Sequence, residues 1–428
     1  MGVFLCFYFV PLQVMRFLYN SSIAIASLLL SLIAVFNQKI KLFVDGRKET
    51  FVKLSVLATE KNTVWVHAAS LGEFEQGRPI IEKIKAQYPQ YKIVLTFFSP
   101  SGYEIQKEYE LADVVCYLPL DSKKNAAKFL ELVQPKVAIF IKYELWPNFL
   151  KELQKRKIST LLVSGIFRKE QIFFKSYGRW MRKSLATFDH FFVQDDASKQ
   201  LLKTIQLENV TVSGDTRFDR VSAILQQDNH LDFVSQFKNN NYTVVAGSTW
   251  KEDEALLVNY INEVASDDEK FIIAPHNINQ KEIEALKKAI AKKTVLFSEM
   301  EAENLSEAQV LIIDTIGLLT KIYASGDAAY VGGGLTKSGL HNVLEPATFG
   351  LPIVIGPTYK KYKEVVDLVA LKGCKVIADQ VQFSAIFTRL KADVSYREKT
   401  GQINKKYIQE NIGATGVIMK YVHEKLNR

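Results

Sequence analysis

The first half of this chain alternates short apolar runs with longer amphipathic stretches. The apolar runs have the length and composition of buried strands. They cover Val64–Ala68, Tyr91–Thr96, Val114–Leu118, Val137–Ile141, Thr160–Ser164 and Phe191–Gln194. Helical stretches such as Gly77–Tyr88 and Asn125–Val133 lie between them. Strands that alternate with helices predict a parallel sheet covered on both faces.

A second series of the same kind fills the rest of the chain. Its apolar runs are Tyr242–Ala246, Phe271–Ala274, Thr294–Phe297, Val310–Ile313, Ala328–Val331 and Pro352–Ile355. The segment Arg220–Asn241 between the two series is polar and weakly patterned, as a linker would be. The pattern predicts two doubly wound domains of similar size with a cleft between them, and ligands outside the carboxyl ends of the strands.

The N-terminus carries a longer apolar run, Phe17–Phe36, preceded by a second run, Val3–Leu12. Twenty helical residues span about 30 Å, the thickness of a bilayer core. The positive-inside rule places the rest of the chain in the cytoplasm, because the next residues include Lys39, Lys41, Arg47 and Lys48. A removable signal peptide fits less well, since the small residues Ala24–Ala26 lie inside the run. The helix either spans the membrane or lies in its interface.

These patterns divide the chain into four parts. We expect a membrane anchor over residues 1–38, a first domain over 39–219, a linker over 220–241 and a second domain over 242–428. The last helix is a candidate to pack back on the first domain.

Composition indicates a globular protein from a reducing compartment. Of its 428 residues, 48% are hydrophobic and 24% charged. The three cysteines and six histidines show neither a disulfide framework nor metal-ligand spacing, so we predict no structural metal.

The formal charge of +9 is concentrated in one segment, residues 151–183, which holds ten Lys/Arg and two Glu with aromatic residues between them. Such a mixture binds nucleic acid, contacts anionic lipid headgroups, or is only a solvated basic face. The apolar N-terminus favours lipid over nucleic acid. The predicted contacts are Arg168, Lys169, Lys175, Arg179, Trp180 and Arg182.

Glycines follow the apolar run Ala328–Val331 and precede a predicted helix near His341. Gly332, Gly333 and Gly334 let the backbone approach a ligand closely, and free N–H groups at a helix start suit a phosphate. Asn342 and Glu345 are three residues apart, so on a helix they share a face that could hold a ribose diol. The alternative is a tight turn without a ligand. The spacing fits neither a P-loop nor a dinucleotide fingerprint.

Two acidic residues follow strands of the first domain. Glu73 is placed to act as a general base, or only to complement a helix N-terminus. Glu144 is a second acid or the partner of a cation, and Trp146-Pro147 favours packing and a helix start.

Strand ends of the second domain offer further ligand contacts. Ser248 and Thr249 suit a phosphate, although Thr249 and Glu252 also fit a capping box. Pro275-His276 could touch a base or phosphate, and the Asp314–Gly317 turn could hold a nucleobase. There is no Ser-His-Asp pattern, Cys nucleophile or Asp-x-Asp motif, which favours direct displacement on a nucleotide-activated group without a divalent cation.

Taken together, the motifs resemble those of the 3-deoxy-D-manno-octulosonic acid (Kdo) transferases of lipopolysaccharide assembly. They are His67–Glu73, Glu144–Asn148, Gly214–Asp219, Ala246–Thr249, Gly332–Gly334 and His341–Pro346, in that order. The resemblance implies a GT-B glycosyltransferase that moves Kdo from CMP-Kdo to a lipid A precursor, lipid IVA, with inversion at the anomeric carbon. It also implies no cofactor and no metal for the transfer, and a place at the cytoplasmic face of the inner membrane.

The resemblance assigns roles to residues as well. Glu73 is the expected base, with Glu144 beside it, in an acceptor-binding first domain. The second domain is expected to bind CMP-Kdo through Ser248, Thr249, Pro275, His276, Gly317, Gly332, Gly333, Gly334, Asn342 and Glu345. The expected partners are CMP-Kdo, the lipid A precursor and anionic inner-membrane lipids, with no nucleic acid.

The chain departs from the family pattern at Lys142, where a second Glu is common, at Pro275, where many members have Arg, and at Leu318, where Glu is common. Two other functions stay open on the residues alone. One is a GT-B transferase that uses a UDP-sugar, and the other is a membrane-surface binding protein without activity.

Overall fold

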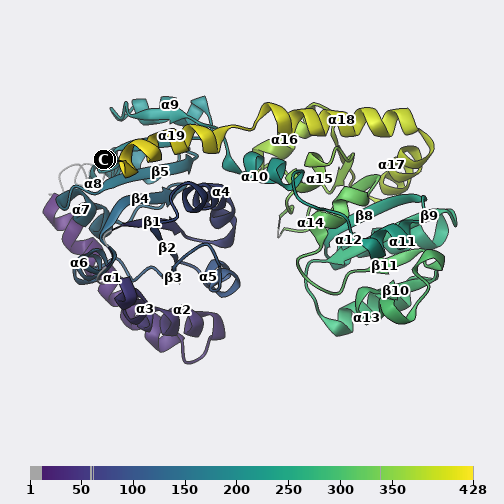
Figure 1. The fold of residues 1–428 in the computed structure, drawn as a ribbon, viewed down its shortest axis with the longest axis horizontal. Helices are drawn as coiled ribbons and strands as arrows, with labels where there is room; N and C mark the ends of the chain where they lie inside the picture. The colour runs from purple at the N-terminus through teal and green to yellow at the C-terminus, as the bar shows by residue number, and fades with distance from the viewer. Residues whose placement is uncertain (1–11, 58–59, 61, 338, 428) are drawn as a thin grey trace, which may run out of the picture. The chain divides into compact units, whose positions relative to one another are not determined.

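A computed structural model describes residues 12–57, 60, 62–337 and 339–427. It divides into two compact units (Figure 1). Unit 1 comprises Met1–Arg220 and Ile412–Arg428, and unit 2 comprises Val221–Asn411. Most of the predicted apolar run Val3–Leu12 lies outside the described residues.

Unit 1 is built on a parallel sheet that has seven strands among the described residues, in the order β3-β2-β1-β4-β5-β6-β7. The strands are β1 (Thr63–Ala68), β2 (Lys92–Phe97), β3 (Val114–Tyr117), β4 (Pro135–Ile141), β5 (Ser159–Gly165), β6 (His190–Val193) and β7 (Val210–Val212). Its helices are α1 (Leu12–Ile33), α2 (Gln38–Lys48), α3 (Thr50–Leu54), α4 (Leu71–Gln87), α5 (Pro100–Gln106), α6 (Lys123–Val133), α7 (Pro147–Lys155), α8 (Arg179–Leu185), α9 (Asp196–Lys203) and α19 (Ala414–Leu426). Helix α10 (Thr216–Ile224) begins in unit 1 and ends in unit 2. The predicted doubly wound parallel sheet is confirmed.

Helices cover both faces of this sheet, as a parallel sheet requires. On one face α3, α6, α7, α8 and α9 pack around Trp65, Phe129, Phe140 and Phe149. On the other face α4 and α19 pack together, with Ile418 and Val422 of α19 fully buried. The C-terminal helix therefore lies across unit 1 and completes its core (Figure 1).

Unit 2 repeats the architecture with a second parallel sheet, of the order β10-β11-β9-β8-β12-β13-β14 among the described residues. Its strands are β8 (Tyr242–Thr249), β9 (Glu269–Pro275), β10 (Thr294–Leu296), β11 (Val310–Ile312), β12 (Ala328–Val331), β13 (Ile353–Ile355) and β14 (Cys374–Val376). Its helices are α11 (Asp232–Lys238), α12 (Lys251–Glu263), α13 (Gln280–Ala289), α14 (Leu319–Ile322), α15 (Leu344–Thr348), α16 (Lys363–Ala370), α17 (Gln380–Ala392) and α18 (Val394–Glu410).

The segment 220–241, predicted as a linker, contains the end of α10 and the whole of α11. Val234 and Phe237 of α11 are fully buried, so this polar segment packs into unit 2 through two apolar side chains.

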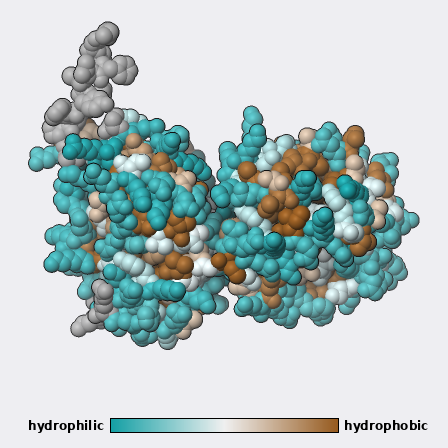
Figure 2. All heavy atoms as spheres, turned by 90° about the horizontal axis from the view of Figure 1, so that it is seen from above, coloured by the Kyte–Doolittle hydropathy of each residue, from teal (hydrophilic) through white to brown (hydrophobic). Residues whose placement is uncertain are grey.

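Helix α1 differs from the other helices because its apolar side chains face outward. Ile25, Leu28 and Leu32 are each more than half exposed. By length and composition, Gln13–Ile33 is the one helical stretch in the described part of the chain that could cross a membrane. The face of the molecule drawn in Figure 2 is mostly hydrophilic, with hydrophobic side chains gathered in separate patches.

Candidate active site

In each sheet the chain reverses its direction of winding at one pair of neighbouring strands, β1 and β4 in unit 1 and β8 and β12 in unit 2. Ligands of doubly wound sheets bind beside the carboxyl ends of such a pair. The predicted acids follow β1 and β4, and Ser248, Thr249 and the glycines stand at the ends of β8 and β12.

Glu73 stands in the first turn of α4, directly after β1. Ser70 is the N-cap of this helix, and its backbone N–H donates to Glu73 Oε2 at 3.1 Å. Glu73 therefore has the structural role that was its alternative interpretation, but it is also buried, with 8% of its surface exposed. Burial, and then the nearby Glu144 carboxylate, raise the pKa of Glu73 to about 7, against the opposing effect of Lys142. A carboxyl with this pKa is suited to accept a proton at neutral pH.

The structure brings Lys142 and Glu144 to the same place. Lys142 directly follows β4 in a left-handed conformation (φ 64°). Both residues act electrostatically on Glu73. A cation thus stands where the resembled family commonly has an acid, and it favours the charged form of the predicted base.

His67 forms a buried network under this site that the sequence did not predict. The Trp146 indole N–H donates to His67 Nε2 at 3.0 Å, so this nitrogen carries no proton. The other ring nitrogen, Nδ1, then carries the proton and donates to Thr96 Oγ1 at 2.9 Å. Glu144 Oε2 is 3.9 Å from His67 Nε2. The network fixes Trp146 at the start of α7, where the sequence predicted only packing and a helix start.

Asp121 is a second buried residue that the sequence did not single out. Its carboxylate accepts the backbone N–H groups of Asn148 and Phe149, each at 3.0 Å, and so caps α7. It also accepts the Tyr19 hydroxyl of α1 at 2.8 Å. Burial raises the pKa of Asp121. One carboxylate thus joins α1 to the helix that follows Glu144.

The motif Gly214–Asp219 and the next residue, Arg220, hold α4, the helix that carries Glu73. Thr216 Oγ1 donates to the Gln76 carbonyl of α4 at 2.6 Å, and Arg220 forms an ion pair with Glu75. Asp219 accepts the backbone N–H groups of Gly413 and Thr415 at the start of α19, at 2.5 and 2.6 Å. This motif therefore has a positioning role, which local sequence patterns could not reveal.

In unit 2, close packing explains why the residues after β12 are glycines. A Cβ on Gly332 would lie 2.3 Å from the Ser248 carbonyl oxygen, and Gly333 has φ +89°. The N–H of Gly332 donates to the Gly247 carbonyl at 2.9 Å, and that of Gly333 donates to Asp253 Oδ2 at 2.9 Å. These two N–H groups are therefore used within the protein.

Asp253 organises this loop, and the sequence did not identify it. Its carboxylate also accepts the Trp250 backbone N–H at 2.9 Å and the Tyr330 hydroxyl at 2.7 Å. It is fully buried, and burial raises its pKa. The capping box predicted for Thr249 and Glu252 is wrong, because Trp250 is the N-cap and Asp253 supplies the acid.

Asn342 and Glu345 lie together, although not on one helix as predicted. The helix expected near His341 begins at Leu344 and has five residues. Asn342 Oδ1 accepts the Leu344 N–H at 3.0 Å, and its Nδ2 donates to Glu345 Oε1 at 3.1 Å. The other Glu345 oxygen accepts the Thr320 hydroxyl at 2.7 Å, in the helix that follows Gly317.

His276 joins an aromatic stack with Trp250 and His341. Trp250 lies 4.7 Å from His276 between ring centroids, and its indole N–H donates to His341 Nε2 at 3.0 Å. Burial, and then His276, lower the pKa of His341 to about 4, and burial lowers that of His276. Both rings are therefore neutral at pH 7 and present a flat, uncharged surface.

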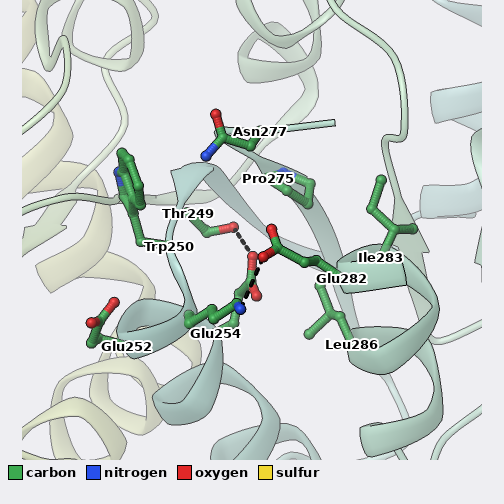
Figure 3. A pocket seen from close by; sticks show the side chains of 10 residues that line it. Thr249, Trp250, Glu252, Glu254, Pro275, Asn277, Glu282, Ile283 and Leu286 are labelled. Atoms are coloured by element: carbon green, nitrogen blue, oxygen red, sulfur yellow. Dashed lines mark hydrogen bonds and ion pairs between the residues drawn. The ribbon is translucent and has the colours of Figure 1, made fainter. Parts of the chain in front are cut away.

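Thr249 and Pro275 line a small acidic pocket of about 290 Å³ (Figure 3). The Thr249 hydroxyl donates to Glu254 at 3.0 Å, and Glu252 and Glu282 stand around the same pocket. This side of Thr249 is poorly suited to a phosphate. Ser248, with φ 54°, is the remaining hydroxyl at this strand end.

The basic segment of unit 1 is only partly exposed. Arg168, Lys169 and Arg179 are exposed, whereas Lys175 and Trp180 are half-buried. Arg182 donates to the carbonyls of Phe173 and Lys175, both at 2.7 Å, and so stabilises the segment itself. Among the described residues there is no group of three or more His, Cys, Asp or Glu that could hold a metal ion.

Comparisons with known proteins agree with these features. Residues 45–220 match the family model described as 3-deoxy-D-manno-octulosonic-acid transferase (kdotransferase). The Kdo transferase of Aquifex aeolicus is 26% identical over 82% of this chain and 93% of its own length. That of Haemophilus influenzae is 26% identical over 85% of this chain and 87% of its own.

Solved structures show the fold. UDP-GlcNAc 2-epimerase from Neisseria meningitidis has a TM-score of 0.59 at 14% identity, over 85% of this chain and 100% of its own. MurG from Acinetobacter baumannii has a TM-score of 0.53 at 10% identity, over 85% of this chain and 99% of its own. The predicted GT-B fold class is thus confirmed. Over most of its length the chain is similar to Kdo transferases, and it is a glycosyltransferase.

Proposed function

We propose that this protein transfers Kdo from CMP-Kdo to a hydroxyl group of a lipid A precursor such as lipid IVA, with inversion at the anomeric carbon. The observation that carries the proposal is the buried Glu73 carboxyl, with its pKa raised to about 7, at the point of unit 1 where ligands of such sheets bind. The curated relatives named Kdo transferases support the choice of sugar.

The chemistry is a single displacement. The acceptor oxygen attacks the anomeric carbon of Kdo and gives its proton to Glu73. The bond between that carbon and the phosphate oxygen breaks, and the electron pair leaves with CMP. Lys142 keeps Glu73 partly ionised, which a base requires.

The donor contacts belong to unit 2. Glu345, already oriented by Asn342 and Thr320, is suited to accept hydrogen bonds from the ribose hydroxyls. The loop Gly332–Gly334 and Ser248 shape the place for the phosphate, and Pro275, His276 and Gly317 surround the nucleoside. Since the Gly332 and Gly333 N–H groups are used internally, the loop contributes through its shape.

We also place the protein at the cytoplasmic face of the inner membrane. The exposed apolar side chains of α1 and the exposed cations Arg168, Lys169 and Arg179 suit an anionic lipid surface.

The test is a reaction of the purified full chain with CMP-Kdo and tetraacyl lipid A precursor. Release of CMP together with a glycolipid heavier by one or more Kdo residues, seen by mass spectrometry, is the expected result. Calorimetric titration should show tighter binding of CMP than of UDP. A protein that releases no CMP, or binds UDP more tightly, contradicts the proposal.

A further inference from the structure

A groove runs along the inner side of α1, between this helix and the rest of unit 1. One part, of about 700 Å³, lies between α1 and the start of α6. The next part, of about 360 Å³, lies between α1, α2 and the loop after β3. Ser27, Leu120 and Asn125 line both parts, so the two form one groove.

The groove exists because α1 is bonded to unit 1 near its N-terminal end. Tyr19 donates to Asp121 at 2.8 Å, and Asn148 Nδ2 donates to Asn20 Oδ1 at 2.9 Å. The Tyr19 ring also lies 5.6 Å from that of Trp180. The groove lies beside these contacts and continues along the helix as far as Leu30 and Ser31.

The groove is lined by cations without acids. Arg16 and Lys123 line its first part, Arg47 and Lys48 line its second, and neither part has an Asp or Glu in its lining. Lys151 lies close to the first pair, and the charge of Arg16, followed by burial and Lys123, lowers its pKa. Like charges therefore crowd one end of the groove.

The carboxylates nearby are already engaged. Asp121 accepts two backbone N–H groups and the Tyr19 hydroxyl. Glu152 pairs with Arg156 at 2.9 Å, and Asp45 pairs with Lys48 at 2.7 Å. An anion that enters the groove from outside would relieve the repulsion at the end formed by Arg16, Lys123 and Lys151.

The rest of the lining is mainly apolar. Phe17 and Ile23 line the first part, and Leu30, Phe43 and Phe51 line the second. A free phosphate would use only the charged end. A lipid would use both the charged end and the apolar walls, with its phosphate at the cations and one acyl chain along the walls.

We propose that this groove binds one anionic glycerophospholipid of the membrane, with its phosphate between Arg16 and Lys123 and an acyl chain under α1. The lipid would fill the space between α1 and unit 1 and fix the angle at which the helix meets the membrane. This inference rests on the membrane location in the proposed function, and on nothing in the chemistry of Glu73.

Native mass spectrometry of the full chain can test the groove. The protein is exchanged from vesicles of phosphatidylglycerol and phosphatidylcholine, mixed one to one, into mild detergent. We expect it to retain one phosphatidylglycerol. The triple variant Arg16→Gln, Lys123→Gln, Lys151→Gln should lose retention at least about tenfold, because each cation near a lipid phosphate contributes several-fold.

Two further variants make the result specific. Ser27→Trp leaves every charge in place but fills the middle of the groove, so it should also lose the lipid. The triple variant Lys203→Gln, Lys399→Gln, Lys420→Gln removes the same charge from exposed positions outside the groove and should retain it.

Three results would overturn the proposal. The first is no retained lipid, or equal retention of phosphatidylcholine. The second is unchanged retention in both groove variants. The third is retention of the lipid A precursor in place of phosphatidylglycerol, which would make the groove part of the acceptor site. CMP release is measured in parallel, so a protein that transfers Kdo but retains no lipid refutes the groove alone.

Discussion

At the scale of single residues, Glu73 is a buried carboxyl whose pKa burial raises to about 7. Glu73 and Glu144 were predicted from their places after strands, and the structure brings them together with Lys142. His67, Asp121 and Asp253 were not assigned a role, because most of their partners lie 27 or more residues away along the chain. Buried hydrogen bonds of this separation leave no local pattern.

The raised pKa of Glu73 predicts a pH dependence of the rate. The base must be ionised, so below its pKa of about 7 the rate should fall about tenfold for each pH unit. The measurement is the initial rate of CMP release between pH 5.5 and 9 at saturating donor. A rate that stays constant from pH 8 down to pH 5.5 would contradict the assignment.

The same carboxyl should cost stability at high pH. Its folded pKa of about 7 exceeds its usual 4.5, so the folded state binds more protons between these values and stability falls as the pH rises through them. The free energy of unfolding of Glu73→Gln should therefore exceed that of the wild type at pH 8, by up to about 3 kcal/mol. At pH 4.5 the two proteins should be about equally stable. Thermal unfolding at both values checks this, and a variant less stable at pH 8 refutes it.

At the scale of elements, strands were predicted better than helix ends. Long apolar runs predicted the central strands, whereas β7 and β14, each with three residues, were missed. The start of α15 was predicted near His341, but the helix begins at Leu344, whose N–H donates to the Asn342 side chain in the preceding turn. A turn of this kind depends on the conformation of the whole loop, which a helical pattern along the chain does not show.

Asp253 links α12 to the glycine loop, and its loss should disturb both. In Asp253→Asn the charged acceptor becomes a neutral amide, whose donor must face either the N–H groups of Trp250 and Gly333 or the Tyr330 hydroxyl. We expect the free energy of unfolding of unit 2 to fall by about 1–3 kcal/mol, and CMP to bind more weakly. Denaturant unfolding and calorimetry measure the two effects. Glu252→Gln, at an exposed position of the same helix, is the control, and equal behaviour of the two variants would contradict the role of Asp253.

At the scale of the whole molecule, the sequence predicted two doubly wound domains, and the structure has them. The last helix was a candidate to pack on the first domain, and α19 does complete the core of unit 1. The packing of the predicted linker was harder to predict, because α11 occupies part of it. Such contacts depend on tertiary packing, which a pattern along the chain does not encode.

The C-terminal helix should therefore stabilise unit 1. Ile418 is fully buried there, and Ile418→Ala should destabilise unit 1 by about 2–5 kcal/mol. The neighbouring Val417 is 38% exposed, and Val417→Ala should change stability by about 0.5 kcal/mol or less. Hydrogen exchange of β1 and β4 reports unit 1 directly. Protection that is unchanged in Ile418→Ala would show that α19 does not support this core.

The most direct test of the central claim is the turnover of Glu73→Gln with CMP-Kdo and the lipid A precursor. Gln keeps the size of the side chain and the hydrogen bond that caps α4, but it cannot accept a proton at neutral pH. The turnover number should fall by about 10²–10⁴-fold with CMP binding unchanged, while the control Glu82→Gln on the same helix stays near the wild-type rate. A Glu73→Gln enzyme that releases CMP at close to the wild-type rate would show that Glu73 is not the base.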